Sequence, residues 1–388
     1  MSSSDIAVVG LGVMGRNLAS NLLDNGFKVS GWDADNQWVK DNSDFCEQSG
    51  LKHVENLNAL LDSVKSPKKI LLLIPAGKPV DQIIAELSVI LSPGDVLVDC
   101  GNSNYKDSMA RGSRLLERDV NFVGLGLSGG ALGALHGPSL MFGGNDFAWG
   151  QLLPILERVA AKGRYGPCIK KFGSFGAGHF VKMVHNGIEY AEMQIIAEAH
   201  DLMSRGLGLS HRDQSDFFKD ANEGRLGGFL TELAANVLSS ETTSLDQIID
   251  SAEQKGTGAW AVNTALDLGV STPSIDAAVG ARLLSSFWQE RQRRSEIFRP
   301  SILGSSSKPL QLADLEKAIW FAKVCTYAQG FDLLKAGNET HGWDISIEGV
   351  CSVWTEGCII RGKILNTVVE GLSRDPGCQV LEIPSLKE

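Results

Sequence analysis

The sequence predicts two domains, an α/β domain over residues 1–175 and an all-α domain over residues 176–388. The first prediction rests on short apolar segments of strand length, which alternate with amphipathic segments up to about Phe172. The second rests on the chain after Gly206, where helical patterns follow one another without strand alternation. With 388 residues, the chain is long enough for each domain to bury a core.

Composition and charge exclude several classes of protein. Apolar residues make up 43% of the chain and charged residues 21%, and no apolar run approaches the length of a membrane span. The net charge of −10 disfavours nucleic acid and anionic membrane as partners. The N-terminus enters a strand directly, so we expect no signal or transit peptide.

The cysteines indicate a compartment. The seven of them are odd in number, scattered and without a CxxC spacing. This pattern predicts free thiols in a reducing environment and argues against a disulfide framework or a zinc site. We therefore expect a cytoplasmic protein that binds no metal.

The N-terminal segment has the pattern of a dinucleotide site. The apolar residues 6–9 are followed by the motif GLGVMG and then by an amphipathic run. In this strand–turn–helix context Gly10 permits a tight turn, Gly12 lets a pyrophosphate approach the backbone, and Gly15 lets the helix pack on the strand. We therefore predict a Rossmann-like domain. The predicted coenzyme contacts of the motif are Gly10, Leu11, Gly12, Val13, Met14 and Gly15.

The ends of the following strands supply further candidates. A strand over residues 28–32 ends at Asp33, where an acid would bind a ribose 2′-hydroxyl. Strand ends in open α/β sheets point at the ligand, so the residues after the strands 70–74 and 96–99 are candidates for the nicotinamide side. These are Ile74, Pro75 and Ala76 after the first strand, and Gly101, Asn102 and Ser103 after the second.

A Gly-rich segment follows the next predicted strand, residues 121–123. Residues 124–130 read GLGLSGG, which we predict to be a loop. Successive backbone N–H groups in such a loop suit a carboxylate, and a flexible turn is the alternative reading.

Residues 176–193 predict a long buried helix with one unusual face. Lys182, His185, Asn186 and Glu189 occupy positions i, i+3, i+4 and i+7 beside an apolar stripe. Two turns separate Lys182 from Glu189, roughly 10 Å along the axis. The two side chains could therefore reach opposite ends of a substrate with five or six carbons. For these four residues taken alone, a solvated helix face is the alternative.

The helical half contains two further cations of interest. Lys255, flanked by Gly and followed by the hydroxyl of Thr257, would make a phosphate grip. Arg282 lies in the apolar helix 277–287, where an arginine normally needs a partner. Residues 199–203 and 330–334 are weakly similar and are both expected to end long helices. This similarity predicts two helical repeats, the second incomplete.

With these motifs, the chain resembles the decarboxylating 6-phosphogluconate dehydrogenases from about residue 5 to about residue 375. The resemblance implies a Rossmann-like domain, an all-helical domain and a homodimer. It also implies oxidation of 6-phospho-D-gluconate at C3 with NADP or NAD, then loss of CO2 to give ribulose 5-phosphate, a step of the pentose phosphate pathway. The motifs that carry it are GLGVMG, residues 99–103, 128–130, 137–141, 180–190 and 254–258, and Cys358-Ile-Ile-Arg361.

The resemblance also implies roles for individual residues. Lys182 matches the general base and Glu189 the general acid, and no metal is needed. The residues that match the carboxylate and hydroxyl side of the substrate are Asn102, Ser128, Gly129, Gly130, His185 and Asn186. Those that match its phosphate end are Tyr190, Lys255, Thr257 and Arg282.

Two departures from the family concern the coenzyme. The family usually has Asn-Arg-Thr where this chain has Asp33, Ala34 and Asp35, and a Lys where this chain has Pro75. Carboxylates thus stand where a 2′-phosphate would lie. Like charges about 4 Å apart repel by on the order of 4 kcal/mol at an effective dielectric constant near 20, as an upper guide. We therefore expect NAD to be preferred over NADP.

A third departure concerns the C-terminus. Typical members continue well past residue 388, and their tail supplies an Arg and a His to the substrate phosphate of the partner subunit. The absence of these residues from this chain leaves three alternatives. The phosphate is held more weakly, or the sequence is truncated, or the chain is a catalytically decayed, nucleotide-binding regulatory paralogue. A dehydrogenase of a related 3-hydroxy acid is a further alternative. An incomplete helical domain would expose an apolar patch, which favours self-association.

Overall fold

The computed structural model describes residues 3–35, 37, 42–240, 245–252, 256–297 and 311–387. By compactness the chain divides into two units, Met1–Met183 with Leu334–Arg361 and Val184–Leu333 with Gly362–Glu388. The predicted boundary between residues 175 and 176 stays a prediction. The compact units differ from it in that a later segment, Leu334–Arg361, belongs to the first unit.

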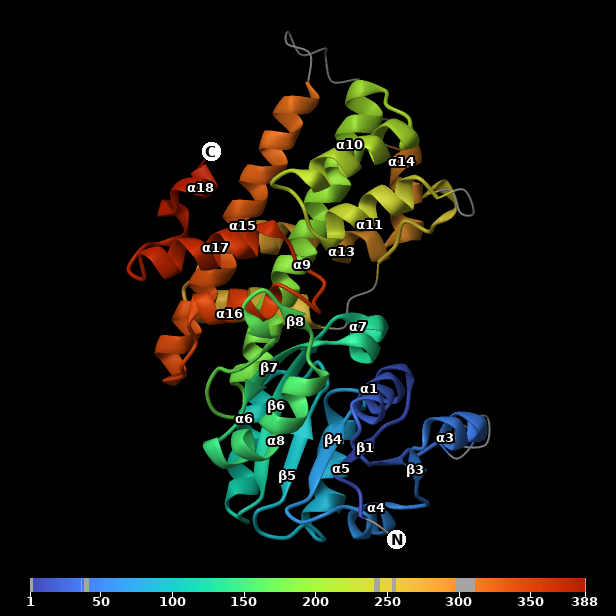
Figure 1. Ribbon diagram of the computed structural model, residues 1–388. Helices are drawn as coiled ribbons and strands as arrows, with labels where there is room; N and C mark the ends of the chain where they lie inside the picture. Colours follow the sequence, from blue (N-terminus) through green and yellow to red (C-terminus); the bar gives the residue numbers. More distant parts are fainter. Residues whose placement is uncertain are drawn as a thin grey trace. The chain divides into compact units, whose positions relative to one another are not determined.

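An eight-stranded sheet forms the centre of the first unit (Figure 1). Its strand order is β10-β7-β6-β5-β4-β1-β2-β3, and all neighbours run parallel except β6 and β7. β8 (Lys162–Gly163) and β9 (Gly166–Pro167) form a separate pair. The strands of the main sheet are β1 (Ile6–Val9), β2 (Val29–Trp32), β3 (Lys52–His53), β4 (Lys69–Leu72), β5 (Val96–Asp99), β6 (Asn121–Ser128), β7 (Ser139–Gly143) and β10 (Ile169–Lys171).

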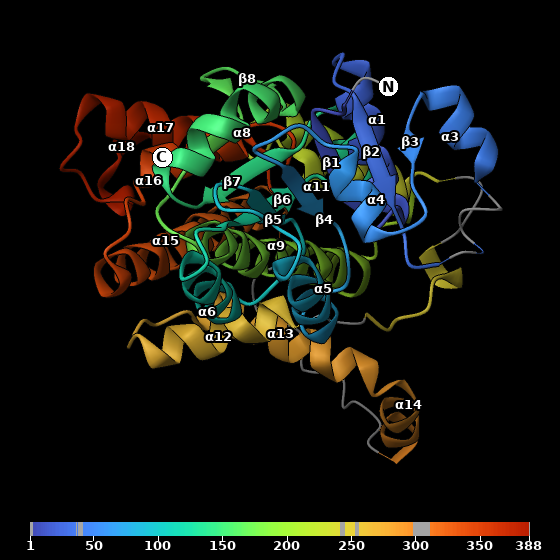
Figure 2. The same ribbon diagram turned by 90° about the horizontal axis from the view of Figure 1, so that it is seen from below.

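Helices cover both faces of this sheet. Ile6 and Val8 of β1 belong to a core with the helices α1 and α8, whereas Ala7 and Val9 belong to a core with α4 and α5. Figure 2 shows α8 on one side of the sheet and α5 and α6 on the other. Strands buried on both faces are near-continuous apolar runs, which explains the apolar segments in the sequence. The helices are α1 (Val13–Asp24), α3 (Ser43–Ser49), α4 (Leu57–Asp62), α5 (Lys78–Ser88), α6 (Tyr105–Leu116), α7 (Gly130–His136), α8 (Asp146–Val159) and α16 (Ile347–Trp354).

The Gly-rich segment 124–127 is part of a strand, and the prediction of a loop there was wrong. β6 continues to Ser128 because its alternate glycines leave room for the helix α9 (Ala177–Asp201). A Cβ on Gly126 would lie 2.6 Å from the carbonyl oxygen of Gly178 and 2.6 Å from the Cβ of Lys182. The absent side chains thus let α9 pack directly on the sheet backbone.

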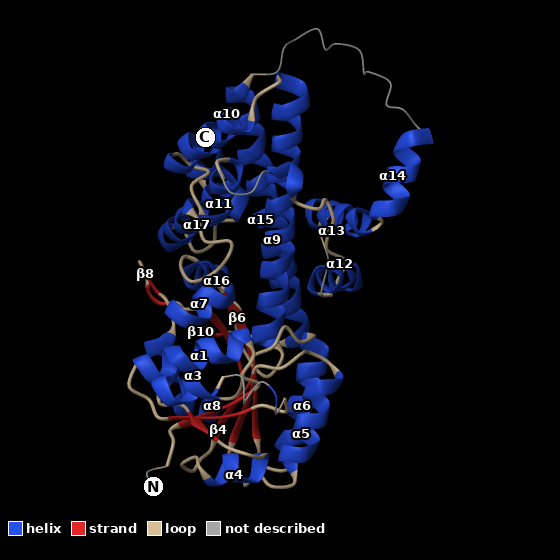
Figure 3. Cartoon of the chain, turned by 90° about the vertical axis from the view of Figure 1, so that its right-hand side faces the viewer, coloured by secondary structure: helices blue, strands red, loops and turns tan. Residues whose placement is uncertain are grey.

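The described residues of the second unit form helices without a named strand, as predicted (Figure 3). No helix in the described part of the chain is long and apolar enough to cross a membrane. The helices are α9, which begins in the first unit, α10 (His211–Glu223), α11 (Phe229–Leu238), α12 (Thr257–Asp267), α13 (Pro273–Ser286), α14 (Trp288–Ile297), α15 (Leu312–His341), α17 (Lys363–Arg374) and α18 (Pro384–Lys387), with a π-helical turn over Leu202–Gly206 and 3₁₀ turns over Leu245–Gln247 and Val380–Glu382.

One helix end differs from its prediction. Residues 199–203 lie where α9 ends, but residues 330–334 lie inside α15, which continues to His341. Gly330 does not end this helix, because it is a packing residue. A Cβ there would lie 2.6 Å from the Cδ1 of Ile188, so the glycine allows α15 to approach α9 within the second unit.

We expect Gly126→Ala to lower the free energy of unfolding by roughly 1–3 kcal/mol or more, because the new methyl group has no room beside α9. Chemical denaturation of the purified protein would measure this loss. Gly150→Ala is the matched control, since Gly150 is an exposed residue of α8 with no atom within 4 Å of an added Cβ. A Gly126→Ala variant as stable as the Gly150→Ala variant would contradict the packing explanation.

Candidate active site

The GLGVMG turn has the geometry of a pyrophosphate cradle. Gly10 has a φ of +90°, and a Cβ on it would lie 2.5 Å from the carbonyl oxygen of Leu73. A Cβ on Gly15 would overlap the carbonyl group of Gly10, whereas one on Gly12 would meet none of the described residues within 4 Å. The first and third glycines are thus required by the turn and its packing. The middle glycine leaves open space at the N-terminus of α1, where helix N–H groups favour an anion.

The remaining residues of the motif lie in and after this turn. The backbone N–H of Leu11 donates a 2.6 Å hydrogen bond to the carboxylate of Asp33, which holds the end of β2 against the turn. The other carboxylate oxygen of Asp33 accepts a 2.9 Å bond from the N–H of Asp35. Val13 and Met14 begin α1. The side chain of Val13 is 57% exposed, whereas Met14 packs against the core.

A cleft of about 460 Å³ opens beside the turn. Two carboxylates, Asp33 and Glu86, line it, and no Lys or Arg does so among the described residues. Of the predicted residues after β4, Ile74 and Pro75 line the cleft and Ala76 does not. The sequence interpretation missed a group of lining residues on or next to α5, whose signal is their helical spacing. The full lining is Val9, Gly10, Gly12, Trp32, Asp33, Ala34, Leu73, Ile74, Pro75, Pro79, Gln82, Ile83 and Glu86.

The loop after β5 presents Asn102 on a fixed support. Asp99 is fully buried, and one of its carboxylate oxygens accepts a 3.0 Å hydrogen bond from the N–H of Gly101. The other accepts a 2.7 Å bond from the hydroxyl of Ser103. Asn102 is exposed between these two anchored neighbours. The sequence interpretation did not give Asp99 a role of its own.

The predicted residues 128–130 lie between β6 and α7. Ser128 is buried, and Gly129 and Gly130 then turn the chain with φ angles of +121° and +62°. A Cβ on Gly129 would lie 2.9 Å from the Cα of Gly133. The left-handed glycines therefore place the backbone of this turn, and not side chains, at the surface of the first unit.

Within the first unit, the face of α9 carries Lys182 in a buried setting. Lys182 is only 6% exposed. Cys358 is fully buried close to it. Burial raises the pKa of the Cys358 thiol well above its usual range, and the Lys182 charge opposes this rise. The thiol is therefore neutral. In the sequence, Cys358 belongs to the motif at residues 358–361, but its position next to Lys182 was not predicted.

One helical turn earlier on α9, His179 is a buried residue that the sequence interpretation missed. Its Nδ1 lies 2.7 Å from the hydroxyl oxygen of Ser108 on α6. Burial lowers the pKa of the His179 imidazole, although the charge of Asp99 opposes this effect. His179 is thus a neutral hydrogen-bonding residue that joins two helices of the first unit.

Within the second unit, the same face of α9 continues with three predicted residues. The Nδ1 of His185 lies 3.0 Å from the side-chain oxygen of Asn186 and 3.6 Å from the carboxylate of Glu189. The side-chain amide of Asn186 donates a 3.2 Å hydrogen bond to the hydroxyl of Thr257. His185 is fully buried, whereas the Glu189 side chain is 21% exposed. The fold therefore brings Thr257 to this face from a distant part of the chain.

Tyr190 and Arg282 form a second cluster in this unit. The guanidinium carbon of Arg282 lies 4.3 Å from the centre of the Tyr190 ring, a cation–π contact. Tyr190 also packs against Gly258, where a Cβ would lie 2.7 Å from the ring. Thr257 is the first residue of α12, whose N-terminus favours an anion. Lys255, the remaining predicted phosphate ligand, lies outside the described residues.

A buried ion pair follows Glu189 by one turn and was not predicted. The Nζ of Lys323 on α15 lies 3.0 Å from a carboxylate oxygen of Glu192 on α9. The two side chains are 7% and 5% exposed, and the other oxygen of Glu192 has no hydrogen-bond partner among the described residues. In the sequence, each of the two is a charged residue among apolar ones, which indicates a buried charge that needs a partner. The pair itself could not be predicted, because the two residues lie far apart in the sequence.

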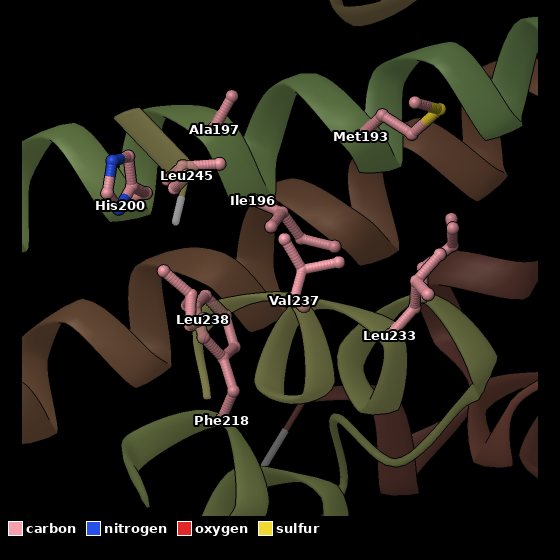
Figure 4. A pocket seen from close by; sticks show the side chains of 11 residues that line it. Met193, Ile196, Ala197, His200, Phe218, Leu233, Val237, Leu238 and Leu245 are labelled. Atoms are coloured by element: carbon pink, nitrogen blue, oxygen red, sulfur yellow. The ribbon is translucent and has the colours of Figure 1, made fainter. Parts of the chain in front are cut away.

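The helical unit also contains an apolar groove that does not suit a sugar phosphate. Ile196, Phe218 and Val237 line it with other apolar side chains, and Figure 4 shows several of them converging. The exception is His200, whose Nδ1 lies 2.6 Å from the side-chain oxygen of Gln214. Its described lining includes no Lys or Arg to bind a carboxylate or phosphate, so we do not assign the substrate to it.

Comparison with known proteins matches both halves of the chain. Residues 5–173 match the NAD binding domain of 6-phosphogluconate dehydrogenase, and residues 178–385 match its C-terminal domain. The decarboxylating 6-phosphogluconate dehydrogenase of Staphylococcus aureus (strain Mu50) is 39% identical over 388 residues, which cover 98% of this chain and 82% of that protein. The Ovis aries enzyme is 42% identical over 392 residues, covering 98% and 80% of the two chains.

Solved structures agree with this match. The structure of Plasmodium falciparum 6-phosphogluconate dehydrogenase has a TM-score of 0.93 and 32% sequence identity, and the match covers 99% of this chain and 84% of that one. A 3-hydroxyisobutyrate dehydrogenase of Mycobacterium tuberculosis shares the fold, with a TM-score of 0.58 and 18% identity over 82% of this chain and 99% of that one.

We expect Lys323→Met to destabilise the protein by about 3–5 kcal/mol, because it leaves the buried Glu192 carboxylate without a counter-ion. Thermal and chemical unfolding would measure the loss. The double variant Glu192→Met with Lys323→Met should recover most of it. Lys219→Met breaks an exposed ion pair to Asp216 and serves as the control that leaves the unfolding midpoint unchanged. A single variant as stable as this control would refute the pairing.

Proposed function

The chain belongs to the decarboxylating 6-phosphogluconate dehydrogenases, and from this premise we propose how its residues bind and convert the substrate. The family reaction is the oxidative decarboxylation of 6-phospho-D-gluconate to D-ribulose 5-phosphate and CO2 with NAD(P), a step of the pentose phosphate pathway. The observation that carries the proposal is that Lys182 and Glu189 lie two turns apart on one face of the uninterrupted helix α9.

Lys182 is the general base in this proposal. It accepts the proton of the C3 hydroxyl, and the C3 hydride leaves at the same time. When bound, the nicotinamide ring supplies the hydride acceptor. An amine must be neutral to accept a proton, and burial disfavours the charged form of an amine. The buried position of Lys182 supports this role.

Lys182 and Glu189 then share the decarboxylation. The protonated Lys182 donates a hydrogen bond to the new C3 carbonyl oxygen. It stabilises the negative charge there when the C1–C2 bond breaks, CO2 leaves and the electron pair forms the enediolate. Glu189, in its acid form, protonates C2 of the original acid, which becomes C1 of ribulose 5-phosphate. The partial exposure of Glu189 supports this role, since a carboxyl group at the surface of its unit is in reach of solvent protons.

The remaining predicted residues bind the two ends of the substrate. We assign the carboxylate and hydroxyl side to Asn102, Ser128, Gly129, Gly130, His185 and Asn186. The phosphate end is assigned to Tyr190, Lys255, Thr257 and Arg282. The support for the phosphate end is the Arg282 guanidinium on the Tyr190 ring together with the N-terminus of α12 at Thr257.

The coenzyme we propose is NAD. Asp33 is fixed at the GLGVMG turn by the Leu11 amide, where a carboxylate accepts hydrogen bonds from ribose hydroxyls and repels a 2′-phosphate. Glu86 adds a second carboxylate to the cleft, and no described lining residue is a cation. The Plasmodium falciparum relative is described in complex with NADP+, so the preference we propose is a difference from that protein.

We further propose a homodimer in the cytosol. The support for the compartment is the set of seven cysteines, none of them in a disulfide. The support for association is the exposure of large apolar side chains on the helical unit, such as Leu233 and Phe321. No observation favours a different 3-hydroxy acid as substrate, since the likeness to 3-hydroxyisobutyrate dehydrogenase extends to the fold alone.

Lys182→Ala is expected to slow oxidation of 6-phosphogluconate by about 10²–10⁴-fold, because the base is lost. The affinity for reduced coenzyme, measured by fluorescence titration, should change little. Lys171→Ala is the control with normal turnover, because Lys171 is a partly exposed residue of the same unit that pairs with the exposed Asp146. Turnover by Lys182→Ala at the control rate would remove Lys182 from the mechanism.

Replacement of Asp33, Ala34 and Asp35 by Asn, Arg and Thr should move the ratio of kcat/KM for NADP to that for NAD upward by at least about tenfold. The reason is that two carboxylates are removed and a cation is added where the 2′-phosphate would lie. Initial rates with both coenzymes at saturating 6-phosphogluconate would measure the ratio. An unchanged ratio would mean that the coenzyme is not recognised at the end of β2.

A further inference from the structure

We propose that Arg111 is a positioning residue for hydride transfer, because its one guanidinium holds together the two loops between which the coenzyme and the substrate react. The inference rests on the proposed function, which assigns the loop after β4 to the nicotinamide side and Asn102 of the loop after β5 to the substrate. Arg111 itself lies on α6, behind both loops, and contacts neither ligand in this proposal.

Arg111 is a charged side chain in the interior of the first unit. Its side chain is 1% exposed, and that of its partner Asp99 is 0% exposed. A buried guanidinium is stable only when its donors are matched by acceptors. Four acceptors surround the Arg111 guanidinium. Its Nε donates to Asp81 at 2.8 Å, one terminal nitrogen donates to Asp99 at 3.2 Å with Ser103 at 3.4 Å, and the other donates to the carbonyl oxygen of Gly77 at 3.1 Å.

These acceptors lie in two segments at the same edge of the sheet, one around the start of α5 after β4 and the other around the end of β5. Gly77 and Asp81 lie at the start of α5, directly after the proposed nicotinamide residues Ile74, Pro75 and Ala76. Asp99 and Ser103 enclose the loop that presents Asn102. The loops also touch each other, since a Cβ on Gly101 would lie 3.2 Å from the carbonyl oxygen of Ile74. One side chain therefore sets the spacing of both.

Only a guanidinium can hold the acceptors of both segments at the same time. Arginine has five N–H donors in a planar fork, so it can donate in three directions at fixed angles. Lysine has the same charge but is a point-like group on a flexible stem, and it cannot reach Gly77, Asp81 and Asp99 together in this arrangement. The hydrogen bond from Arg111 holds the pKa of the Asp81 carboxyl below its usual value, in agreement with a formed ion pair.

The helix that carries Arg111 is joined to the helix that carries the base. Ser108, one turn before Arg111 on α6, contacts the Nδ1 of His179 on α9 at 2.7 Å. His179 lies one turn before Lys182, so α6 links the two loops to the start of the catalytic face. Hydride transfer requires donor and acceptor carbons at near-contact distance, and a misplacement of about 1 Å costs roughly 10²-fold in rate.

The first test is Arg111→Lys, which keeps the charge and removes the fork. We expect the single-turnover rate of coenzyme reduction, followed by stopped-flow absorbance, to fall by about 10–100-fold. The KM values for coenzyme and 6-phosphogluconate should change by less than about threefold, because no ligand-binding group is removed. Arg114→Lys is the matched control on the same helix. Arg114 approaches Asp81 at 3.7 Å, is 66% exposed, and should keep the wild-type rate.

A second measurement does not depend on turnover. Hydrogen exchange of the variants without ligand should show faster exchange in Arg111→Lys at the Gly101 amide and over residues 77–81, and no change in Arg114→Lys. The affinity for reduced coenzyme, titrated by fluorescence, should stay within about threefold of the wild-type value. A role in overall stability alone would raise exchange throughout the sheet and would not single out these loops.

Asp81→Asn keeps the proposal testable if Arg111→Lys does not fold. Asp81 is 48% exposed, and Asp81→Asn removes its charge while keeping a side-chain oxygen that can accept from the buried Arg111 Nε. The variant therefore weakens the ion pair without leaving the guanidinium unpaired. Its single-turnover rate should fall by about 3–10-fold. If Arg111→Lys folds and reacts at the wild-type rate, the role of Arg111 is overturned and the proposed function is not. If Arg111→Lys does not fold, a wild-type rate in Asp81→Asn has the same meaning. A wild-type protein without turnover would overturn the proposed function and the inference with it.

Discussion

The direct contact between the backbones of α9 and the sheet is the constraint on which the rest of the structure depends. Gly124 and Gly126 on β6, Gly143 at the end of β7 and Gly178 on α9 have no side chains to keep the elements apart. A Cβ on Gly143, for instance, would lie 2.5 Å from the backbone nitrogen of Gly178. The Cβ of Lys182 rests against Gly126 as a result. The proposed base is therefore held directly against the sheet backbone.

The loops around this contact obtain their order from buried polar groups. Asp99 accepts hydrogen bonds from Gly101 and Ser103, and Arg111 extends the same network to the start of α5. Each of these groups would be costly to bury alone, and together they are satisfied. The first unit thus fixes its strand-end loops from behind, while a Cβ built on Gly12 would meet none of the described residues within 4 Å.

Much of the fold could be predicted from local patterns. Strands buried on both faces leave apolar runs, the GLGVMG motif specifies a strand–turn–helix unit, and spacing alone placed Lys182, His185, Asn186 and Glu189 on one face of α9. The failures concern residues whose role depends on a distant partner. A glycine that ends a strand and one that admits a helix look the same in sequence, which explains the error over residues 124–127.

Partners distant in sequence explain the other misses as well. We predicted a helix end at residues 330–334, because the contact of Gly330 with Ile188 depends on the fold and cannot be inferred from the sequence. The Glu192–Lys323 pair joins two long helices, and neither segment specifies the other. Among the proposed phosphate ligands, the packing of Arg282 on Tyr190 could not be predicted, although the need for some partner could.

The uninterrupted course of α9 has a consequence for how this chain tolerates changes of length. Lys182 and Glu189 share a face because seven residues make nearly two full turns of helix. Inserting or deleting one residue between them would rotate one side chain away from the other by about 100° and shift it by about 1.5 Å. Surface loops accept such changes readily. In the stretch from Lys182 to Glu189, the proposed chemistry therefore depends on the number of residues as well as on their identity.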